Sequence, residues 1–109
     1  MYKRQLVEID APAGYESEVR EAIRAEVEPL ADEVQVDSLG NLIVRKGSAG
    51  PHGTRVLLVA HMDEIGLIAT HIDENGFVRF TNNGSVHALT CIGGRVRFMN
   101  GVVLSLIHI

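Results

Sequence analysis

Apolar residues recur along this chain with two spacings, and the first of them indicates a helix over residues 16–30. Its apolar positions are four, four and three residues apart: Val19, Ile23, Val27 and Leu30. Charged residues occupy the opposite side, so the segment is expected to form a surface helix that covers a sheet. A shorter helix is predicted over residues 2–9, before a turn at Pro12 to Gly14.

Alternation with a period of two predicts strands in the remainder of the chain. The expected strands are residues 34–36, 42–45, 66–72, 77–81, 95–98 and 102–104. Residues 37–41 have the length of a hairpin connection, and the Asn75-Gly76 pair is a hairpin signal. From residue 66 onward only strands and turns are expected, and residues 82–94 are too rich in Asn, Gly and Ser to predict an element.

An unbroken apolar run, Val56 to Ala60, predicts a strand that is buried on both faces, as in a parallel or mixed α/β sheet. Polar residues follow it at once: His61, Asp63 and Glu64. They would lie at the carboxyl end of the strand, where open α/β sheets bind their ligands.

The character of the chain changes from helix and sheet to all-β at about residues 66–71. The predicted fold class is therefore α/β, with residues 1–68 as part of an α/β sheet domain and residues 69–109 as the start of a small, barrel-like β domain. The apolar end, residues 104–109, falls inside an apparent strand without a cap, so we expect a truncated chain. The sequence leaves open whether these last six residues are native.

Composition narrows the functional classes. The chain has 109 residues, 46% of them hydrophobic and none of them Trp, so its core must consist of Val, Ile, Leu and Ala. The net charge is −4 and the 10 basic residues are scattered, which argues against nucleic acid as a partner. No apolar run approaches a membrane span, no signal segment is evident, and the single cysteine, Cys91, suits a reducing compartment, so the cytoplasm is expected.

The strongest chemical candidates are His61 and Asp63. On an extended backbone two residues that are two apart point to the same face, and an imidazole beside a carboxylate commonly holds a divalent metal. The simpler alternative is a histidine at a strand end beside a surface acid. A catalytic zinc site needs about three protein ligands, so any further ligands must come from elsewhere.

The other candidates favour structural interpretations. His52, His71, His87, His108 and Cys91 show no ligand spacing to one another. Glu64 could act as a general base for a metal-bound water, but it alternates away from His61, so a structural role is preferred. Asp37, Gly40 and Asn41 are best explained as turn residues.

The segment from Val59 to Leu67, with the sequence VAHMDEIGL, resembles the signature of the M42 family of metallo-aminopeptidases, the glutamyl-aminopeptidase-like enzymes. Three weaker segments agree in order: residues 12–16, 37–42 and 76–80. The resemblance extends to about residue 103. Ala13 stands where the family often has serine, and residues 82–94 align poorly with its glycine-rich stretch.

This resemblance implies a two-metal site, with zinc or cobalt, that hydrolyses N-terminal peptide bonds. His61 would be a metal ligand, Asp63 would orient it, and the general base and the other ligands would lie beyond this chain. The substrate would be a peptide, and the full-length protein would be a dimer-based homo-oligomer, in some members a dodecamer. The 109 residues alone are expected to be inactive.

Two alternatives remain open from the sequence. The chain could be a non-catalytic β module for assembly, since its second half is all-β and ends in an unpaired apolar segment. It could also belong to a related deacylase or carboxypeptidase on the same scaffold, because no specificity pocket is present to distinguish these substrates.

Overall fold

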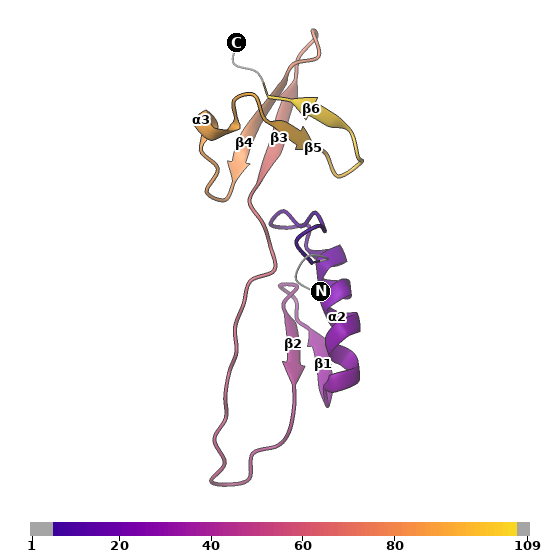
Figure 1. Cartoon of the computed structure of the whole chain (residues 1–109), viewed down its shortest axis with the longest axis vertical. Coiled ribbons are helices and arrows are strands. Elements are labelled where there is room, and N and C mark those ends of the chain that lie inside the picture. Colours follow the sequence, from indigo (N-terminus) through magenta and orange to yellow (C-terminus); the bar gives the residue numbers. More distant parts are fainter. Residues whose placement is uncertain (1–5, 107–109) are drawn as a thin grey trace. The chain divides into compact units, whose positions relative to one another are not determined.

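The computed structural model describes residues 6–106, and it divides the chain into two compact units (Figure 1). The first unit ends at Asp63 and the second begins at Glu64. Helix and antiparallel hairpins occur together, as expected for an α/β chain. Within these residues no helix is both long and apolar enough to cross a membrane.

The first unit is built on the predicted amphipathic helix. Helix α2 spans Ser17–Val27, and a 3₁₀ turn, η1 (Glu28–Leu30), continues it. Pro29 lies in the first turn of η1, where its missing N–H costs no helical hydrogen bond. Val19 and Ala11 form the small buried core, at 4% and 2% exposed. Of the helix expected at residues 2–9, the first four positions lie outside the described residues.

A hairpin lies beside α2 in the first unit (Figure 1). Strand β1 (Glu33–Val36) pairs antiparallel with β2 (Leu42–Arg45), and Val36 faces Leu42 across a five-residue connection, which confirms the predicted hairpin. At the open end Arg45 Nε lies 2.7 Å from Glu33 Oε2. Leu30, at the end of the helical stripe, is 69% exposed, so the hairpin covers only part of that stripe.

The predicted buried strand at Val56–Ala60 is wrong for this chain. Residues 53–60 form no helix or strand, and the four large apolar side chains from Val56 to Val59 are 78–90% exposed. A strand needs a neighbour to pair its N–H and C=O groups. Nothing in the described part of the chain supplies one, so the apolar run stays an unpaired segment (Figure 1).

The second unit contains two hairpins. Strand β3 (Gly66–Ile72) pairs antiparallel with β4 (Val78–Asn83), and β5 (Arg95–Arg97) pairs with β6 (Val103–Ser105). These four strands agree with the predicted ones. A bulge between Ala69 and His71 shifts the register of the first pair, and Thr70 Oγ1 donates to the Arg79 carbonyl oxygen there.

Two expectations for the second unit need correction. A short helix, α3 (Ala88–Cys91), interrupts the region that was expected to hold only strands and turns. It follows His87 in the polar segment whose composition predicted no element. The strands between residues 66 and 105 form separate two-stranded sheets, so the barrel-like arrangement is not seen among the described residues.

Candidate metal-ligand site

The structure brings His61 and Asp63 into contact. His61 Nδ1 lies 3.0 Å from Asp63 Oδ1 and 3.0 Å from the backbone carbonyl oxygen of Asp63. The backbone carbonyl oxygen can only accept a hydrogen bond, and the same holds for Oδ1 when the carboxyl is ionised. Nδ1 must therefore carry the proton in both contacts. The neutral imidazole therefore presents its lone pair at Nε2.

This pair is accessible from solvent. The His61 side chain is 85% exposed and that of Asp63 is 42% exposed. An imidazole whose Nδ1–H is held by a carboxylate, with Nε2 left as an acceptor, is the usual arrangement of a metal-binding histidine. The donor set thus fits one corner of a metal site, in which His61 would be the ligand and Asp63 would orient it.

The rest of a metal site is not assembled in the described part of the chain. No group of three or more His, Cys, Asp and Glu side chains that could hold an ion occurs among residues 6–106. His52 lies in an exposed turn of the first unit, whereas His71, His87 and Cys91 belong to the second unit. His108 lies outside the described residues.

Glu64, the other acid of the cluster, opens the second unit. Its backbone lies in an isolated β-bridge and its side chain is exposed. It takes part in an interaction of its own within the chain. The contacts of Nδ1 of His61 are made by Asp63 and not by Glu64.

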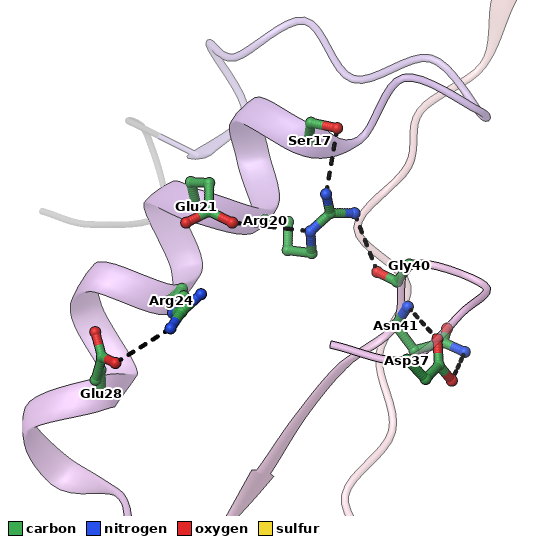
Figure 2. Close-up of polar contacts among 8 residues, drawn as sticks. All are labelled: Ser17, Arg20, Glu21, Arg24, Glu28, Asp37, Gly40 and Asn41. Atoms are coloured by element: carbon green, nitrogen blue, oxygen red, sulfur yellow. Dashed lines mark hydrogen bonds and ion pairs between the residues drawn. The ribbon is translucent and has the colours of Figure 1, made fainter. Parts of the chain in front are cut away.

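The turn at residues 37–41 is a second organised polar feature, and it confirms Asp37, Gly40 and Asn41 as turn residues. Asp37 Oδ1 accepts from the backbone N–H of Leu39 at 3.0 Å. It also accepts from the backbone N–H of Asn41 at 2.8 Å, and Oδ2 accepts from Asn41 Nδ2 at 2.8 Å (Figure 2). These hydrogen bonds, led by that of the Asn41 side chain, lower the pKa of Asp37. The carboxylate therefore ties the connection together in its ionised form.

Arg20 links helix α2 to this turn. The contact was not predictable from the sequence, because Arg20 is one of many charged residues on the polar face of the helix. Its Nη1 donates to the Gly40 carbonyl oxygen at 3.2 Å, and its Nη2 donates to Ser17 Oγ at 3.2 Å (Figure 2). Its side chain is only 18% exposed. Gly40 has φ of +89°, and a Cβ there would lie 3.1 Å from Arg20 Nη1, so the close approach suits glycine.

One protein-family model matches most of the chain. The family model described as M42 glutamyl aminopeptidase matches residues 40–107, which is more than half of the chain. The chain belongs to the M42 glutamyl aminopeptidase family. The matched region of this M42 chain includes His61 and Asp63.

Curated relatives agree with the M42 assignment. A putative aminopeptidase of Acetivibrio thermocellus is 51% identical over 92 residues, which are 84% of this chain and 27% of the relative. Lysyl aminopeptidase of Pyrococcus furiosus is 38% identical over 97 residues, which are 87% of this chain and 27% of that protein. The chain thus spans about a quarter of the length of these relatives.

Solved structures also resemble this M42 chain. An aminopeptidase from Desulfurococcus kamchatkensis superposes with a TM-score of 0.79 at 34% identity, over 92% of this chain and 28% of that one. The PhTET1-12s structure, described as a dodecamer, gives a TM-score of 0.76 at 36% identity, over 93% of this chain and 30% of that one.

Proposed function

We propose that this chain contributes one metal ligand to a metal-dependent aminopeptidase that hydrolyses N-terminal residues from peptides. The observation that supports the proposal most directly is the His61–Asp63 contact, because it leaves Nε2 of an exposed imidazole as a metal ligand within a segment matched by the M42 family. In this proposal residues 1–68 belong to the catalytic domain and residues 69–109 begin a β domain used for assembly.

The residues of this chain have positioning roles in the proposed reaction. Asp63 keeps the proton on Nδ1 and fixes the plane of the His61 ring, and His61 offers Nε2 to one of two divalent ions, zinc or cobalt. When bound, such ions polarise a peptide carbonyl and make a water molecule nucleophilic near neutral pH. The general base and the remaining ligands are assigned to sequence that the longer relatives possess and this chain does not.

Assembly is the second part of the proposal. The second unit has four strands in two-stranded sheets, so each strand has an edge that is unpaired within the described residues. Such edges favour pairing with further strands. Together with the dodecameric relative, this supports a homo-oligomeric, dimer-based full-length protein.

The 109-residue chain is predicted to be inactive by itself, because one histidine cannot supply the roughly three protein ligands that a catalytic zinc site needs. An assay on aminoacyl p-nitroanilides with added zinc or cobalt should show no turnover above buffer. Turnover that disappears in His61→Ala would contradict this prediction.

A chimera tests the proposed function itself. Residues 1–103 replace the matching N-terminal part of Pyrococcus furiosus lysyl aminopeptidase, and hydrolysis of lysyl p-nitroanilide is measured with cobalt or zinc. The unsubstituted chimera should be active. His61→Ala should lower kcat/KM by at least about 100-fold, because losing a ligand should cost more than the roughly 10–100-fold lost with a residue that only orients a ligand. His52→Ala, which removes another exposed histidine of the first unit, is the matched control and should retain activity. A folded chimera that lacks activity, or one that keeps it in His61→Ala, would contradict the proposal.

A further inference from the structure

Two hairpin connections of the second unit carry the same dipeptide, Asn-Gly, at their tips. Asn75-Gly76 lies in the 73–77 connection between β3 and β4, and Asn100-Gly101 lies in the 98–102 connection between β5 and β6. Each glycine has a positive φ, and its N–H donates to the backbone carbonyl oxygen of the first residue of its connection, at 3.0 Å and 2.8 Å respectively. The two tips therefore share one backbone geometry.

At the tip of the 98–102 connection, the asparagine amide is held by the backbone. The Val102 N–H donates to Asn100 Oδ1 at 3.1 Å. The first residue of this connection is Phe98, whose side chain has no acceptor that could compete for that N–H. The amide oxygen of Asn100 therefore has a backbone donor directed at it.

At the tip of the 73–77 connection, the corresponding donor has a different acceptor. The Phe77 N–H donates to Asp73 Oδ1 at 2.9 Å, and the same oxygen accepts from the Asn75 N–H at 2.9 Å. Among the residues that the structure describes, none makes a hydrogen bond to the Asn75 side chain. The amide of Asn75 therefore has no backbone donor and lies near a carboxylate.

An asparagine that precedes glycine can close a ring with the main chain. The glycine nitrogen loses its proton to solvent base and attacks Cγ of the asparagine, so negative charge develops on Oδ1. Nδ2 then takes a proton and leaves as ammonia, which gives a five-membered succinimide. Water opens the ring at either carbonyl and yields aspartate or isoaspartate. Glycine favours the attack because it has no Cβ to restrict the backbone.

We propose that Asn100 is a deamidation site, with water as the reactant, that the 98–102 connection activates. The Val102 N–H is directed at Oδ1, the atom on which the negative charge develops, so it stabilises the transition state as a preorganised donor. Asn75 lacks this donor, and the Asp73 carboxylate disfavours a second negative charge at that tip. Both glycine N–H groups must first leave a backbone acceptor, so that step does not distinguish the two sites.

A third Asn-Gly pair, Asn83-Gly84, lies at the end of β4 and not in a connection. Asn83 is opposite Gly66 in the β3–β4 ladder, so ring closure there would disturb the pairing of the two strands. The comparison of the two connections is therefore the informative one.

Modification of Asn100 would change the β5–β6 hairpin. Either product adds one negative charge to a chain whose net charge is −4. Isoaspartate also carries the main chain through Cβ, which lengthens the connection and disturbs the hydrogen bond of 2.8 Å from the Phe98 N–H to the Val102 carbonyl oxygen. This inference goes beyond the proposed function, and it rests only on hydrogen bonds inside each connection.

Peptide mapping of the full 109-residue chain tests the proposal, because trypsin places the three Asn-Gly pairs on separate peptides, residues 56–79, 80–95 and 98–109. The folded chain is incubated at mildly alkaline pH, and mass spectrometry follows the loss of ammonia and the gain of water. Asn100 should be modified at least about threefold faster than Asn75, a ratio within the range of one hydrogen bond. In urea, which disrupts the hairpins, the two rates should become similar.

Substitutions in the 73–77 connection test the cause of the difference. Asp73→Ala frees the Phe77 N–H and removes the carboxylate, so it should raise the rate at Asn75 toward that at Asn100. Glu74→Ala is the matched control, since it removes a carboxylate that accepts neither of the two N–H groups bound by Asp73, and it should leave the rate unchanged. Hydrogen exchange of the β3 and β4 amides verifies that the hairpin is retained.

The reciprocal variant, Phe98→Asp, keeps the test valid if Asp73→Ala loosens its hairpin. It gives the Val102 N–H a carboxylate acceptor and should slow modification of Asn100. Equal rates at Asn75 and Asn100 in the folded chain, or a ratio that urea does not change, would overturn the proposal. The same holds if neither variant, with its hairpin retained, alters the rate at its own connection.

Discussion

At the scale of single residues, the site depends on which ring nitrogen of His61 carries the proton. Asp63 supplies two acceptor oxygens to Nδ1, one from its carboxylate and one from its backbone. A metal takes a histidine through the nitrogen without a proton. The contact therefore selects Nε2 before any metal is bound.

This selection predicts the tautomer of His61. Two-bond ¹⁵N–¹H correlation spectra of the neutral side chains should show His61 mainly as the Nδ1–H form. His52, an exposed histidine in a turn, is the internal control and should show mainly the Nε2–H form usual for free imidazole. An Nε2–H form at His61 would contradict the site geometry.

Arg20 is the residue through which α2 contacts the 37–41 turn. Its guanidinium donates to both Gly40 and Ser17 from a largely buried position. Hydrogen bonds from a charged group contribute more than those of neutral pairs, and a lost donor leaves the Gly40 carbonyl oxygen without this partner.

Arg20→Ala should lower the free energy of unfolding of the first unit by about 1–2 kcal/mol. Arg24→Ala, one turn later on the same helix, is the matched control: its ion pair to Glu28 spans 3.5 Å with both side chains largely exposed, and its loss should cost less than about 0.5 kcal/mol. Urea unfolding followed by tyrosine fluorescence measures both losses. Trp is absent from the chain, no Tyr follows Tyr15, and Tyr15 lies in the first unit. If both variants lost the same free energy of unfolding, the contact of Arg20 with Gly40 would not stabilise the first unit more than an exposed ion pair does.

At the scale of elements, the three hairpins use the same connection. In each of residues 37–41, 73–77 and 98–102, the first residue exchanges backbone hydrogen bonds with the fourth and fifth. The fourth residue is a glycine with positive φ: Gly40, Gly76 and Gly101. A carboxylate begins the first two connections, and in both it accepts from the backbone N–H groups of the third and fifth residues.

The Asp37 turn predicts a pH dependence. Its hydrogen bonds lower the folded-state pKa below that of the unfolded chain, so the stabilisation is complete above about pH 4 and is lost as the pH falls through the lower folded value. The Gly47 N–H, followed by Lys46, lowers the pKa of Asp32 in the same unit and acts in the same direction. The urea midpoint of the first unit should therefore drop as the pH falls below about 4.

Asp37→Asn separates the contribution of this turn. It should lower the urea midpoint near pH 6 and reduce the drop on acidification, because the ionised acceptor is gone at every pH. Glu26→Gln is the control, since Glu26 is an exposed acid of α2 outside the turn. A drop of unchanged size in Asp37→Asn would mean that the carboxylate does not stabilise the fold.

The elements that were predictable from the sequence are those whose causes are local. The stripe of Val19 to Leu30 gave α2 with η1, and period-two runs with glycine turns gave the hairpins. The failures have non-local causes. Val56–Ala60 has the sequence of a buried strand, but burial depends on a neighbour that the described residues lack, and the contact of Arg20 with Gly40 joins positions 20 residues apart.

The local part of the candidate site was predictable from the sequence, and the distant part was not. Spacing placed His61 and Asp63 on one face, and the structure puts them in contact. Spacing could not provide the other ligands, and residues 6–106 contain no group that completes the site. The resemblance carried by residues 59–67 identified the family, which the family model then confirmed.

At the scale of the whole molecule, the chain corresponds to about a quarter of its curated relatives, 27% of both the Acetivibrio and the Pyrococcus proteins. In the proposed function, this chain would provide His61, its orienting carboxylate and the beginning of a β unit. The remaining ligands, the general base and the strands beside Val56–Ala60 would come from sequence that the longer relatives have.

The central claim is that His61 binds metal through Nε2 while Asp63 holds Nδ1. A crystal structure of the zinc-loaded chimera with lysyl aminopeptidase tests it most directly. The account predicts anomalous density for zinc at about 2.0–2.1 Å from His61 Nε2, with Asp63 still on Nδ1. Zinc bound without His61, or through its Nδ1, would contradict the account.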